Sequence, residues 1–271
     1  NQELLEKAQN IIDRAYQGKT ETDLVELNGP IISHQKVDAL IEAFLKAHDL
    51  EERIKVSWSS SYIARATMSS DTIKLKTTAE FRHYDTLGMI YHEIGTHALR
   101  RVNYERQPWF KKKKKNGFGP YLKTEEGLAS IHSLLPRENK SAYATAIRYL
   151  AVDFAQNHSF SELWHFLTPY IDQEEKRWIA TFRQKRGLED TSRTGGFTKD
   201  LVYFEGMHEV LSWLLKNDDD PTLLYLGKFS HTDLELAKRL SNMGSITIPY
   251  FVKQKEEYTQ NIQKIRREML F

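Results

Sequence analysis

The sequence contains no cysteine, no long apolar run and almost no net charge. The absence of cysteine excludes disulfide bonds, thiolate metal sites and cysteine nucleophiles. No apolar stretch approaches the length that crosses a bilayer, so we expect no membrane partner. The formal net charge of +2 provides no global field that would favour nucleic acid. With 40% hydrophobic and 28% charged residues, the composition is typical of a soluble globular protein.

No linker rich in proline, glycine or serine divides the 271 residues, and no fixed-period repeat is visible. We therefore expect one domain over residues 1–271. Because the chain begins at Asn1 rather than Met, we also expect trimming at the N-terminus, where a targeting segment could have been lost. Nothing in the sequence indicates secretion, and we expect a cytoplasmic location.

Hydrophobic periodicity predicts an α+β fold that is mainly helical. Apolar residues recur at helical spacing over residues 2–16 and 35–48. Alternation at 54–58, followed by 62–68 and 73–76 around a Ser-Ser-Asp turn, predicts three short strands, with the last two as a hairpin. Further helices are expected at residues 85–101, 124–135, 139–157, 160–185 (broken at Pro169), 198–216, 231–241 and 253–269.

The most informative segment is Tyr91-His92-Glu93-Ile94-Gly95-Thr96-His97, which supplies two imidazoles with a carboxylate between them. On a regular helix, a separation of five residues places His92 and His97 about 140° apart, too divergent to bind one metal ion. A one-residue bulge would return both histidines to one face, and Gly95 tolerates that distortion. The segment therefore predicts a metal site only if this helix is irregular.

A second carboxylate lies in the later run Thr124-Glu125-Glu126-Gly127. Thr124 is a good N-cap, which places Glu126 in the first turn of another helix. Glu126 would complete a three-ligand zinc site with an open position for water, and we assign Glu125 to interaction with the helix dipole. The alternative is a helix with two unrelated histidines, in which Glu126 also only complements the dipole.

These motifs resemble the microtubule-associated tyrosine carboxypeptidases and their bacterial relatives, which are named for a QEGLA motif. The pairing of HEIGTH at 92–97 with EGLA at 126–129 is the most specific part of the resemblance. Glu125 matches the eukaryotic pattern, whereas bacterial members typically have Gln there. Further matching segments follow in order: Gln107-Pro108-Trp109, Lys185-Arg186-Gly187, Asp190-Thr191-Ser192, 196–203 and Pro249-Tyr250-Phe251.

The resemblance implies a zincin-like metallopeptidase that removes a C-terminal aromatic residue, Tyr or Phe. In the eukaryotic members the substrate is the C-terminal tyrosine of α-tubulin. Carried over by motif position, the Zn²⁺ ligands are His92, His97 and Glu126, and the general base is Glu93. The hairpin ahead of the metal helix, particularly residues 73–76, resembles the edge strand with which zinc peptidases bind extended substrates. The alternative is that the hairpin simply closes a small sheet.

A carboxypeptidase also requires a cation for the terminal carboxylate, and we expect it between residues 193 and 203. Lys199 is the first candidate and Arg193 the second, with Thr198 and Tyr203 donating hydrogen bonds. For each residue the alternative is a structural salt bridge or a surface position. The run Lys111–Lys115 predicts an exposed loop that either is simply solvated or attracts an acidic tail, as in tubulin.

Other functions remain open at this point. One is a metallopeptidase of different C-terminal specificity that acts on bacterial peptides. Another is a non-catalytic module that binds acidic protein tails, and a third is a helical protein without metal. His132 lies six residues after Glu126, about 240° around the helix, and is predicted to be structural.

Overall fold

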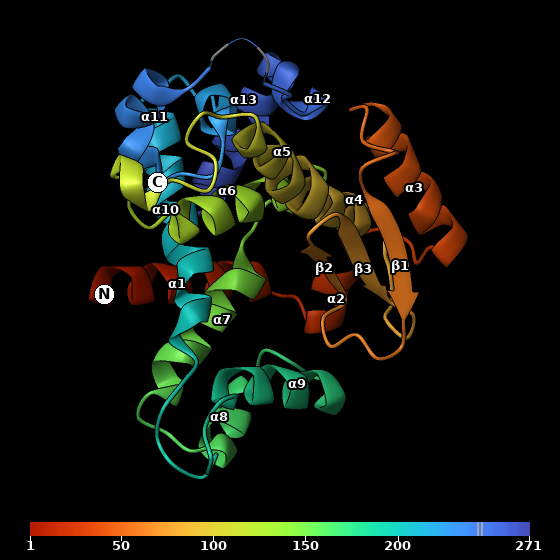
Figure 1. The fold of residues 1–271 in the computed structure, drawn as a ribbon. Helices are drawn as coiled ribbons and strands as arrows, with labels where there is room; N and C mark the ends of the chain where they lie inside the picture. The colour runs from red at the N-terminus through yellow and green to blue at the C-terminus, as the bar shows by residue number, and fades with distance from the viewer. Residues whose placement is uncertain (243, 245) are drawn as a thin grey trace. The chain divides into compact units, whose positions relative to one another are not determined.

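The computed structural model describes residues 1–242, 244 and 246–271. It is mainly helical with one small sheet, which confirms the predicted α+β class (Figure 1). The chain forms two compact units, and the single catalytic domain over residues 1–271 stays a prediction. Unit 1 comprises Asn1–Leu27, Ser141–Glu205 and Arg266–Phe271, and unit 2 comprises Asn28–Lys140 and Gly206–Ile265. Within the described part of the chain, no helix has the length and apolar character that crossing a membrane requires.

Unit 1 is helical. Its elements are α1 (Gln2–Tyr16), α2 (Glu21–Glu26), α7 (Tyr143–Ala155), α8 (Phe160–Leu167), α9 (Glu174–Lys185) and the 3₁₀ turn η3 (Thr198–Asp200). Helix α1 packs against α7, and both bury small and branched apolar side chains, as the helical periodicity predicts. The predicted break near Pro169 separates α8 from α9, whereas the six-residue α2 is too short to give a periodic signal.

A buried lysine organises the loop that follows α9. The Lys185 side chain is fully buried, and its Nζ donates to the carbonyls of Ala155 (3.1 Å), Arg193 (3.0 Å) and Gly195 (2.8 Å). These bonds satisfy an ammonium that would otherwise be costly to bury. They join the end of α7 to the loop that carries Arg193.

The sheet belongs to unit 2 and consists of β1 (Lys55–Ser59), β2 (Ala66–Ser69) and β3 (Thr72–Lys76) in the order β1-β3-β2. Strand β3 pairs in parallel with β1 and antiparallel with β2, so the predicted hairpin is confirmed. The prediction that residues 73–76 form an edge strand is wrong, because β3 has a partner on both sides. The outer strand that contacts the helix carrying His92 and His97 is β2.

The remaining elements of unit 2 are helical. They are α3 (His34–Lys46), α4 (His83–His92), the π-helix η1 (Glu93–Ala98), α5 (Leu99–Glu105), η2 (Lys114–Asn116), α6 (Leu122–Leu134), η4 (Thr222–Leu226), η5 (His231–Asp233), α11 (Leu234–Leu240) and α12 (Tyr250–Lys253). Two helices include residues of both units: α10 (Leu201–Leu215) and α13 (Lys255–Glu268). Most predicted helices therefore exist, although their ends differ by a few residues.

An acidic residue in the first turn of α4 connects the sheet to the helices of unit 2. Asp85 binds Arg65, which precedes β2, and Arg137, which follows α6 (2.7 Å to Nη2). Burial opposes ionisation of Asp85, but the two guanidinium groups lower its pKa to about 2. The carboxylate therefore fixes the start of α4 relative to β2 and α6.

Glycines let three helices meet at backbone contact. A Cβ atom on Gly127 of α6 would lie 2.2 Å from the carbonyl oxygen of Gly206 in α10. A Cβ atom on Gly88 of α4 would lie 2.3 Å from the carbonyl oxygen of Ser133 in α6. Because neither position has room for a methyl group, α6 is fixed closely against both neighbours. This packing determines where Glu126, the residue before Gly127, is placed.

We predict that Gly127→Ala destabilises the protein by about 1–3 kcal/mol, because the new methyl group overlaps backbone atoms that cannot rotate away. Urea unfolding measures this change. Gly119→Ala is the matched control, since its nearest heavy atom would be Asp233 Oδ2 at 3.6 Å, an ordinary contact. Equal stabilities of the two variants would contradict the close packing of α6 on α10.

Candidate metal centre

The helix that carries both histidines changes its winding between them. It runs as an α-helix to His92, as the π-helix η1 over Glu93–Ala98, and again as an α-helix from Leu99. A π-turn accommodates one extra residue, so His97 returns to the face that His92 occupies. The two imidazole rings lie 4.8 Å apart between centroids. The predicted irregular helix is therefore confirmed.

Side chains from distant segments hold the π-turn. Thr96 Oγ1 donates to the carbonyl of Tyr91 at 2.8 Å, and the Tyr225 hydroxyl donates to the carbonyl of Gly95 at 2.7 Å. A Cβ atom on Gly95 would lie 2.8 Å from the ring of Phe251. Glycine is thus required here for close packing against an aromatic ring, in addition to its tolerance of irregular winding.

His132 supports the same turn from α6. Burial, together with the charge of Arg100, lowers the pKa of this fully buried histidine to about 3, so its ring is neutral at pH 7. Because Thr96 uses its hydrogen for the Tyr91 carbonyl, His132 Nδ1 donates to Thr96 Oγ1 at 2.8 Å. His132 Nε2 then accepts from the Tyr258 hydroxyl at 3.0 Å. The predicted structural role of His132 is confirmed.

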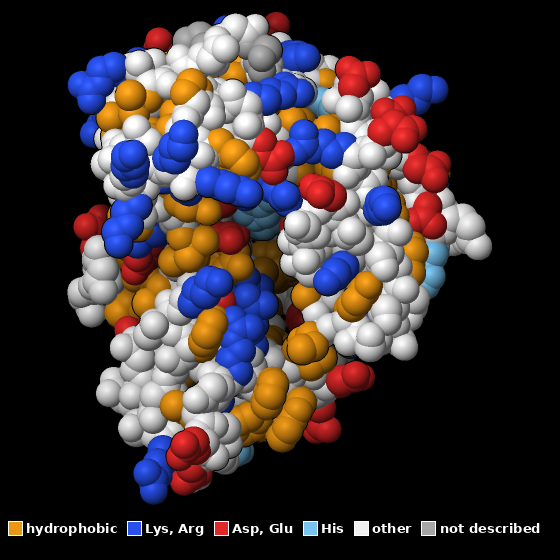
Figure 2. Space-filling view, in the orientation of Figure 1, with side chains coloured by type: hydrophobic (Ala, Val, Ile, Leu, Met, Phe, Trp, Pro, Cys, Tyr) orange, Lys and Arg blue, Asp and Glu red, His pale blue; other side chains and the backbone are white. Residues whose placement is uncertain are grey.

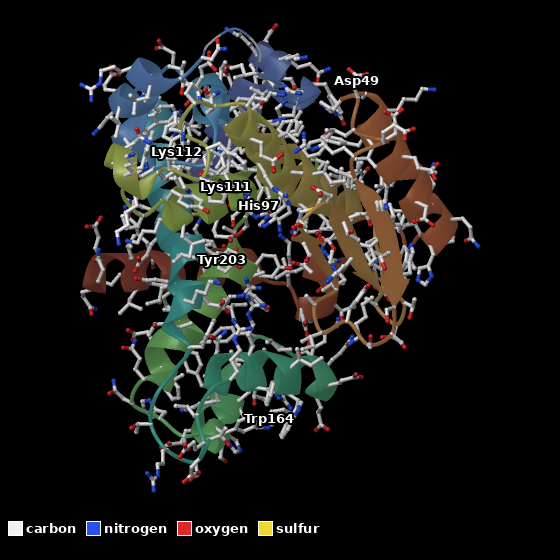
Figure 3. All side chains as sticks on the ribbon, viewed as in Figure 1. Asp49, His97, Lys111, Lys112, Trp164 and Tyr203 are labelled. Atoms are coloured by element: carbon white, nitrogen blue, oxygen red, sulfur yellow. The ribbon has the colours of Figure 1, made fainter. Side chains whose placement is uncertain are left out.

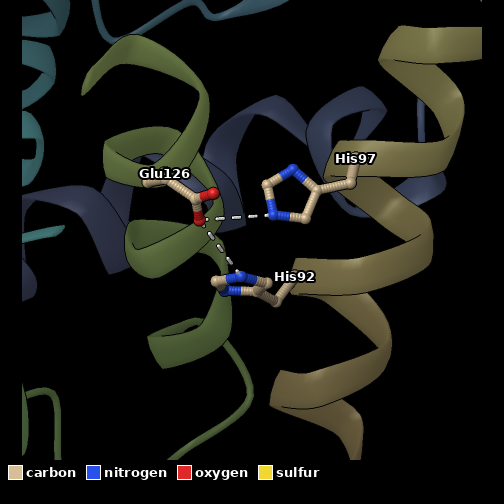
Figure 4. Close-up of side chains that lie close together, drawn as sticks. All are labelled: His92, His97 and Glu126. Carbon is tan, nitrogen blue, oxygen red and sulfur yellow. Dashed lines mark ion pairs between the residues drawn. The ribbon is translucent and has the colours of Figure 1, made fainter. Parts of the chain in front are cut away.

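The three predicted ligands converge on one point (Figure 4). Glu126 Oε2 lies 3.5 Å from His97 Nε2 and 3.8 Å from His92 Nε2, and the three atoms all lie within 4.8 Å of one another. A tetrahedral zinc site with ligand distances of about 2.0–2.1 Å has ligand atoms about 3.3 Å apart. The two contacts to Glu126 are therefore within a few tenths of an ångström of that spacing, and the remaining His92–His97 pair lies within 4.8 Å, so the donor set is compatible with a small cation after the side chains move closer together.

The start of α6 differs from the prediction. The helix begins at Leu122 with Tyr121 at its N-cap, so the prediction that Thr124 caps it is wrong. The Thr124 hydroxyl instead accepts from the backbone N–H of His231 at 3.1 Å and contacts its Nδ1 at 2.9 Å. Glu126 consequently lies in the second turn of the helix, so its predicted place in the first turn is also wrong.

Glu93 lies between the metal ligands and the outer strand. Its Oε2 accepts the backbone N–H of Met68 in β2 at 2.8 Å. Burial raises the pKa of the Glu93 carboxyl above its ordinary value, and nearby Glu126 adds to this effect, while His97 and the Met68 N–H oppose it. A carboxylate with a raised pKa in this position is suited to accept and return a proton.

Behind His97 lies a buried charge cluster that the sequence did not reveal. Glu125 contacts His97 Nδ1 (2.8 Å), Arg100 Nη1 (2.5 Å) and Lys228 Nζ (2.7 Å). Burial disfavours its ionisation, but Lys228, Arg100 and His97 hold the pKa of the Glu125 carboxyl well below its usual range. Glu125 does lie in the first turn of α6, yet interaction with the helix dipole describes only part of its environment.

The same contacts shift the pKa of the His97 ring. Burial lowers the pKa of His97, but hydrogen bonds to Glu125 and Glu126 overcome that effect and raise it to about 10. Binding of a cation at His97 Nε2 would therefore compete with a proton on the ring.

The four residues predicted to bind a substrate carboxylate all lie in unit 1. Lys199 and Thr198 are exposed on η3, and Arg193 is exposed with Asp190 3.2 Å away. Tyr203, which is labelled in Figure 3, lies on α10 with the Arg148 guanidinium 5.3 Å from its ring centroid. Their contact with a substrate stays a prediction.

The lysine run forms the predicted exposed loop. Lys111 and Lys112, both labelled in Figure 3, are exposed after α5, as are Lys114 and Lys115. Lys and Arg side chains gather on this face of unit 2 in Figure 2. Lys113 differs, because its Nζ lies 3.2 Å from the centroid of the Tyr121 ring and burial lowers its pKa to about 8.

We predict that Thr96→Val costs about 1–3 kcal/mol of stability, because it keeps the shape but leaves the Tyr91 carbonyl and His132 Nδ1 without their partner. Urea unfolding measures the loss. Thr168→Val is the matched control, since the exposed Thr168 donates to the carbonyl of Trp164 at 3.2 Å within an ordinary helix turn. A loss no larger than that of the control would show that Thr96 does not hold the π-turn.

The family model described as microtubule-associated tyrosine carboxypeptidase matches residues 1–271. The chain is similar to microtubule-associated tyrosine carboxypeptidase 1 from Rattus norvegicus, with 32% identity over 243 residues, which is 88% of this chain and 52% of the relative. The protein of the same name from Mus musculus is 33% identical over 243 residues, with 88% and 52% coverage. The protein of the same name from Homo sapiens is 32% identical over 243 residues, which is 88% of this chain and 51% of the relative.

The chain thus spans about half the length of the curated relatives it matches. The family match extends over all 271 residues. The chain therefore belongs to the family of microtubule-associated tyrosine carboxypeptidases.

Proposed function

We propose that this protein is a zinc-dependent carboxypeptidase that removes a C-terminal tyrosine or phenylalanine from a protein or peptide tail. The observation that carries the proposal is the convergence of His92, His97 and Glu126 on one point, with Glu93 beside them. The names of the relatives, which specify tyrosine carboxypeptidases, support the reaction.

Zn²⁺ is the proposed ion because the donor set consists of two imidazoles and one carboxylate. Three protein ligands with one open position are characteristic of catalytic zinc sites in peptidases. When bound, zinc supplies Lewis-acid activation of water and of the peptide carbonyl. His92, His97 and Glu126 would hold the ion.

Glu93 is the proposed general base. It accepts a proton from the attacking water as the bond from the water oxygen to the carbonyl carbon forms, and it returns that proton to the leaving amine as the C–N bond breaks. The products are a shortened chain and a free amino acid. The hydrogen bond from Met68 N–H to Oε2 fixes the orientation of the Glu93 carboxylate while the other oxygen remains for this transfer.

We infer a zincin-like architecture from the placement of β2. This outer strand contacts η1, and its alternate backbone groups face away from β3. Because Met68 N–H is bonded to Glu93, an extended peptide would pair with the other outward groups of this strand, which would bring its C-terminus to the metal. We propose that β2 performs the role that the sequence had suggested for residues 73–76.

The proposed substrate class is an acidic tail that ends in an aromatic residue, with α-tubulin as the leading candidate. The exposed lysines among Lys111–Lys115 would attract such a tail from solution in a salt-dependent manner. Lys199 or Arg193, with Thr198 and Tyr203, is proposed to bind the terminal carboxylate. A related peptidase of different specificity, which acts on bacterial peptides, is the alternative.

We predict that Glu93→Gln retains zinc but loses turnover by about 10²–10⁴-fold, because it removes the proton acceptor without removing a ligand. Free tyrosine released from peptides that end in Glu-Glu-Tyr, quantified with and without a chelator, measures turnover. Elemental analysis measures the zinc content. Glu138→Gln is the matched control because Glu138 is exposed in the same unit.

Three outcomes would contradict the proposal in different ways. Full activity of Glu93→Gln would remove Glu93 from the mechanism. Equal release of leucine, lysine and tyrosine from matched peptides would reject the aromatic preference and favour a peptidase of other specificity. Stoichiometric zinc without release of any amino acid would favour a module that binds acidic tails.

A further inference from the structure

Glu125 is buried in a position where a carboxylate needs several partners. Its side chain is 4% exposed, and both of its oxygens are used. Oε1 accepts from His97 Nδ1 at 2.8 Å and contacts Lys228 Nζ at 2.7 Å, while Oε2 accepts from Arg100 Nη1 at 2.5 Å. Two cations and one imidazole therefore fix the carboxylate from three directions.

Backbone carbonyls fix the Arg100 guanidinium, and Lys113 contacts the backbone of Lys228. Arg100 is fully buried, and it donates through Nε to the carbonyl of Leu224 and through Nη2 to the carbonyl of Phe229, both at 3.0 Å. The carbonyl of Lys228 accepts from Lys113 Nζ at 3.1 Å. The segment from Leu224 to Phe229 therefore holds Arg100 and supplies Lys228, and through them it determines where the Glu125 oxygens lie.

The two ring nitrogens of His97 face opposite partners. Nδ1 points to Glu125 at 2.8 Å, and Nε2 points to Glu126 at 3.5 Å. A hydrogen bond from Nδ1–H therefore leaves the Nε2 lone pair directed at the metal point. In metal sites, a carboxylate behind a histidine ligand fixes the tautomer and orientation of the ring and strengthens the ligand. Interaction with the helix dipole alone would require none of these contacts.

We propose that Glu125 is a positioning residue that acts through His97: it holds the ring as the Nδ1–H tautomer and directs Nε2 to the metal. This inference rests on the proposed zinc function and assigns a role that neither motif spacing nor ligand identity supplies. The segment Leu224–Phe229 contributes to this positioning, because it holds Arg100 and contains Lys228, and these two cations orient the carboxylate.

The test compares zinc dissociation constants, measured by competition with a chromophoric chelator, for the wild-type protein, Glu125→Ala and Glu125→Gln. We expect Glu125→Ala to weaken zinc binding by about 10–100-fold. Glu125→Gln should recover part of that loss, because its amide oxygen can accept the Nδ1–H bond. Glu138→Gln should bind zinc as the wild type does.

The unfolding temperature of each metal-free variant measures the structural contribution separately. A merely structural Glu125 would lower that temperature and leave the zinc dissociation constant of the folded variants unchanged, which would overturn the proposal. Because Glu125→Ala leaves Arg100 without its carboxylate, it can fail to fold. A measurement on the wild-type protein therefore complements the variants.

Ring nitrogen and proton correlations in ¹⁵N-histidine-labelled, zinc-loaded wild type report the tautomer directly. His97, assigned by the signals lost in His97→Gln, should carry its proton on Nδ1 and bind zinc through Nε2. A proton on Nε2 would overturn the proposal. Zinc binding without amino acid release would reject the proposed reaction alone. An active enzyme whose zinc affinity is unchanged in both Glu125 variants would reject the role of Glu125 alone. Absence of zinc binding would reject both proposals.

Discussion

The proposed metal centre depends on one π-turn. On a regular helix, a separation of five residues would direct His92 and His97 to different faces, and η1 removes that divergence. The turn gives up regular helical hydrogen bonds, so other groups must satisfy its backbone. Thr96 and Tyr225 accordingly donate to the carbonyls of Tyr91 and Gly95. Each such bond contributes about 0.5–1.5 kcal/mol, and together they keep the unusual winding in place.

Close helix packing holds the proposed third ligand. Glu126 precedes Gly127, which brings α6 to backbone contact with α10, and Gly88 brings α4 equally close to α6. Helices this close have little room to shift, so the carboxylate is presented at a nearly constant distance from the two imidazoles. Irregular winding in one helix and close glycine packing in the other thus both serve to position the three side chains relative to one another.

The sequence predicted the parts of the site that depend on local spacing. Short segments were enough to identify the HEIGTH and EGLA motifs, to predict a bulge near Gly95 and to predict a mainly helical fold. The contributions of Lys228, Tyr225 and Tyr258 were not, because these residues reach the site from segments far along the chain without any periodic signal. The position of Arg100 could have been predicted from local spacing, since it follows His97 by three residues along the same stretch of helix.

The wrong predictions also have physical reasons. Thr124 has the chemistry of an N-cap, but its hydroxyl is used by His231 and the helix begins earlier. The hairpin was correct, yet the parallel pairing of β1 with β3 could not be read from alternation, so the wrong strand was placed at the edge. In both cases a tertiary contact determined the outcome, namely where α6 begins and which strand lies at the sheet edge, and local sequence did not distinguish the alternatives.

X-ray absorption at the zinc edge of the loaded protein tests the central claim most directly. The account predicts one zinc per chain with two imidazole nitrogens and one carboxylate oxygen at about 2.0–2.2 Å, and loss of one imidazole in His92→Ala and in His97→Ala. A spectrum with a single imidazole, unchanged by one of these substitutions, would show that the π-turn does not direct both histidines to the same ion.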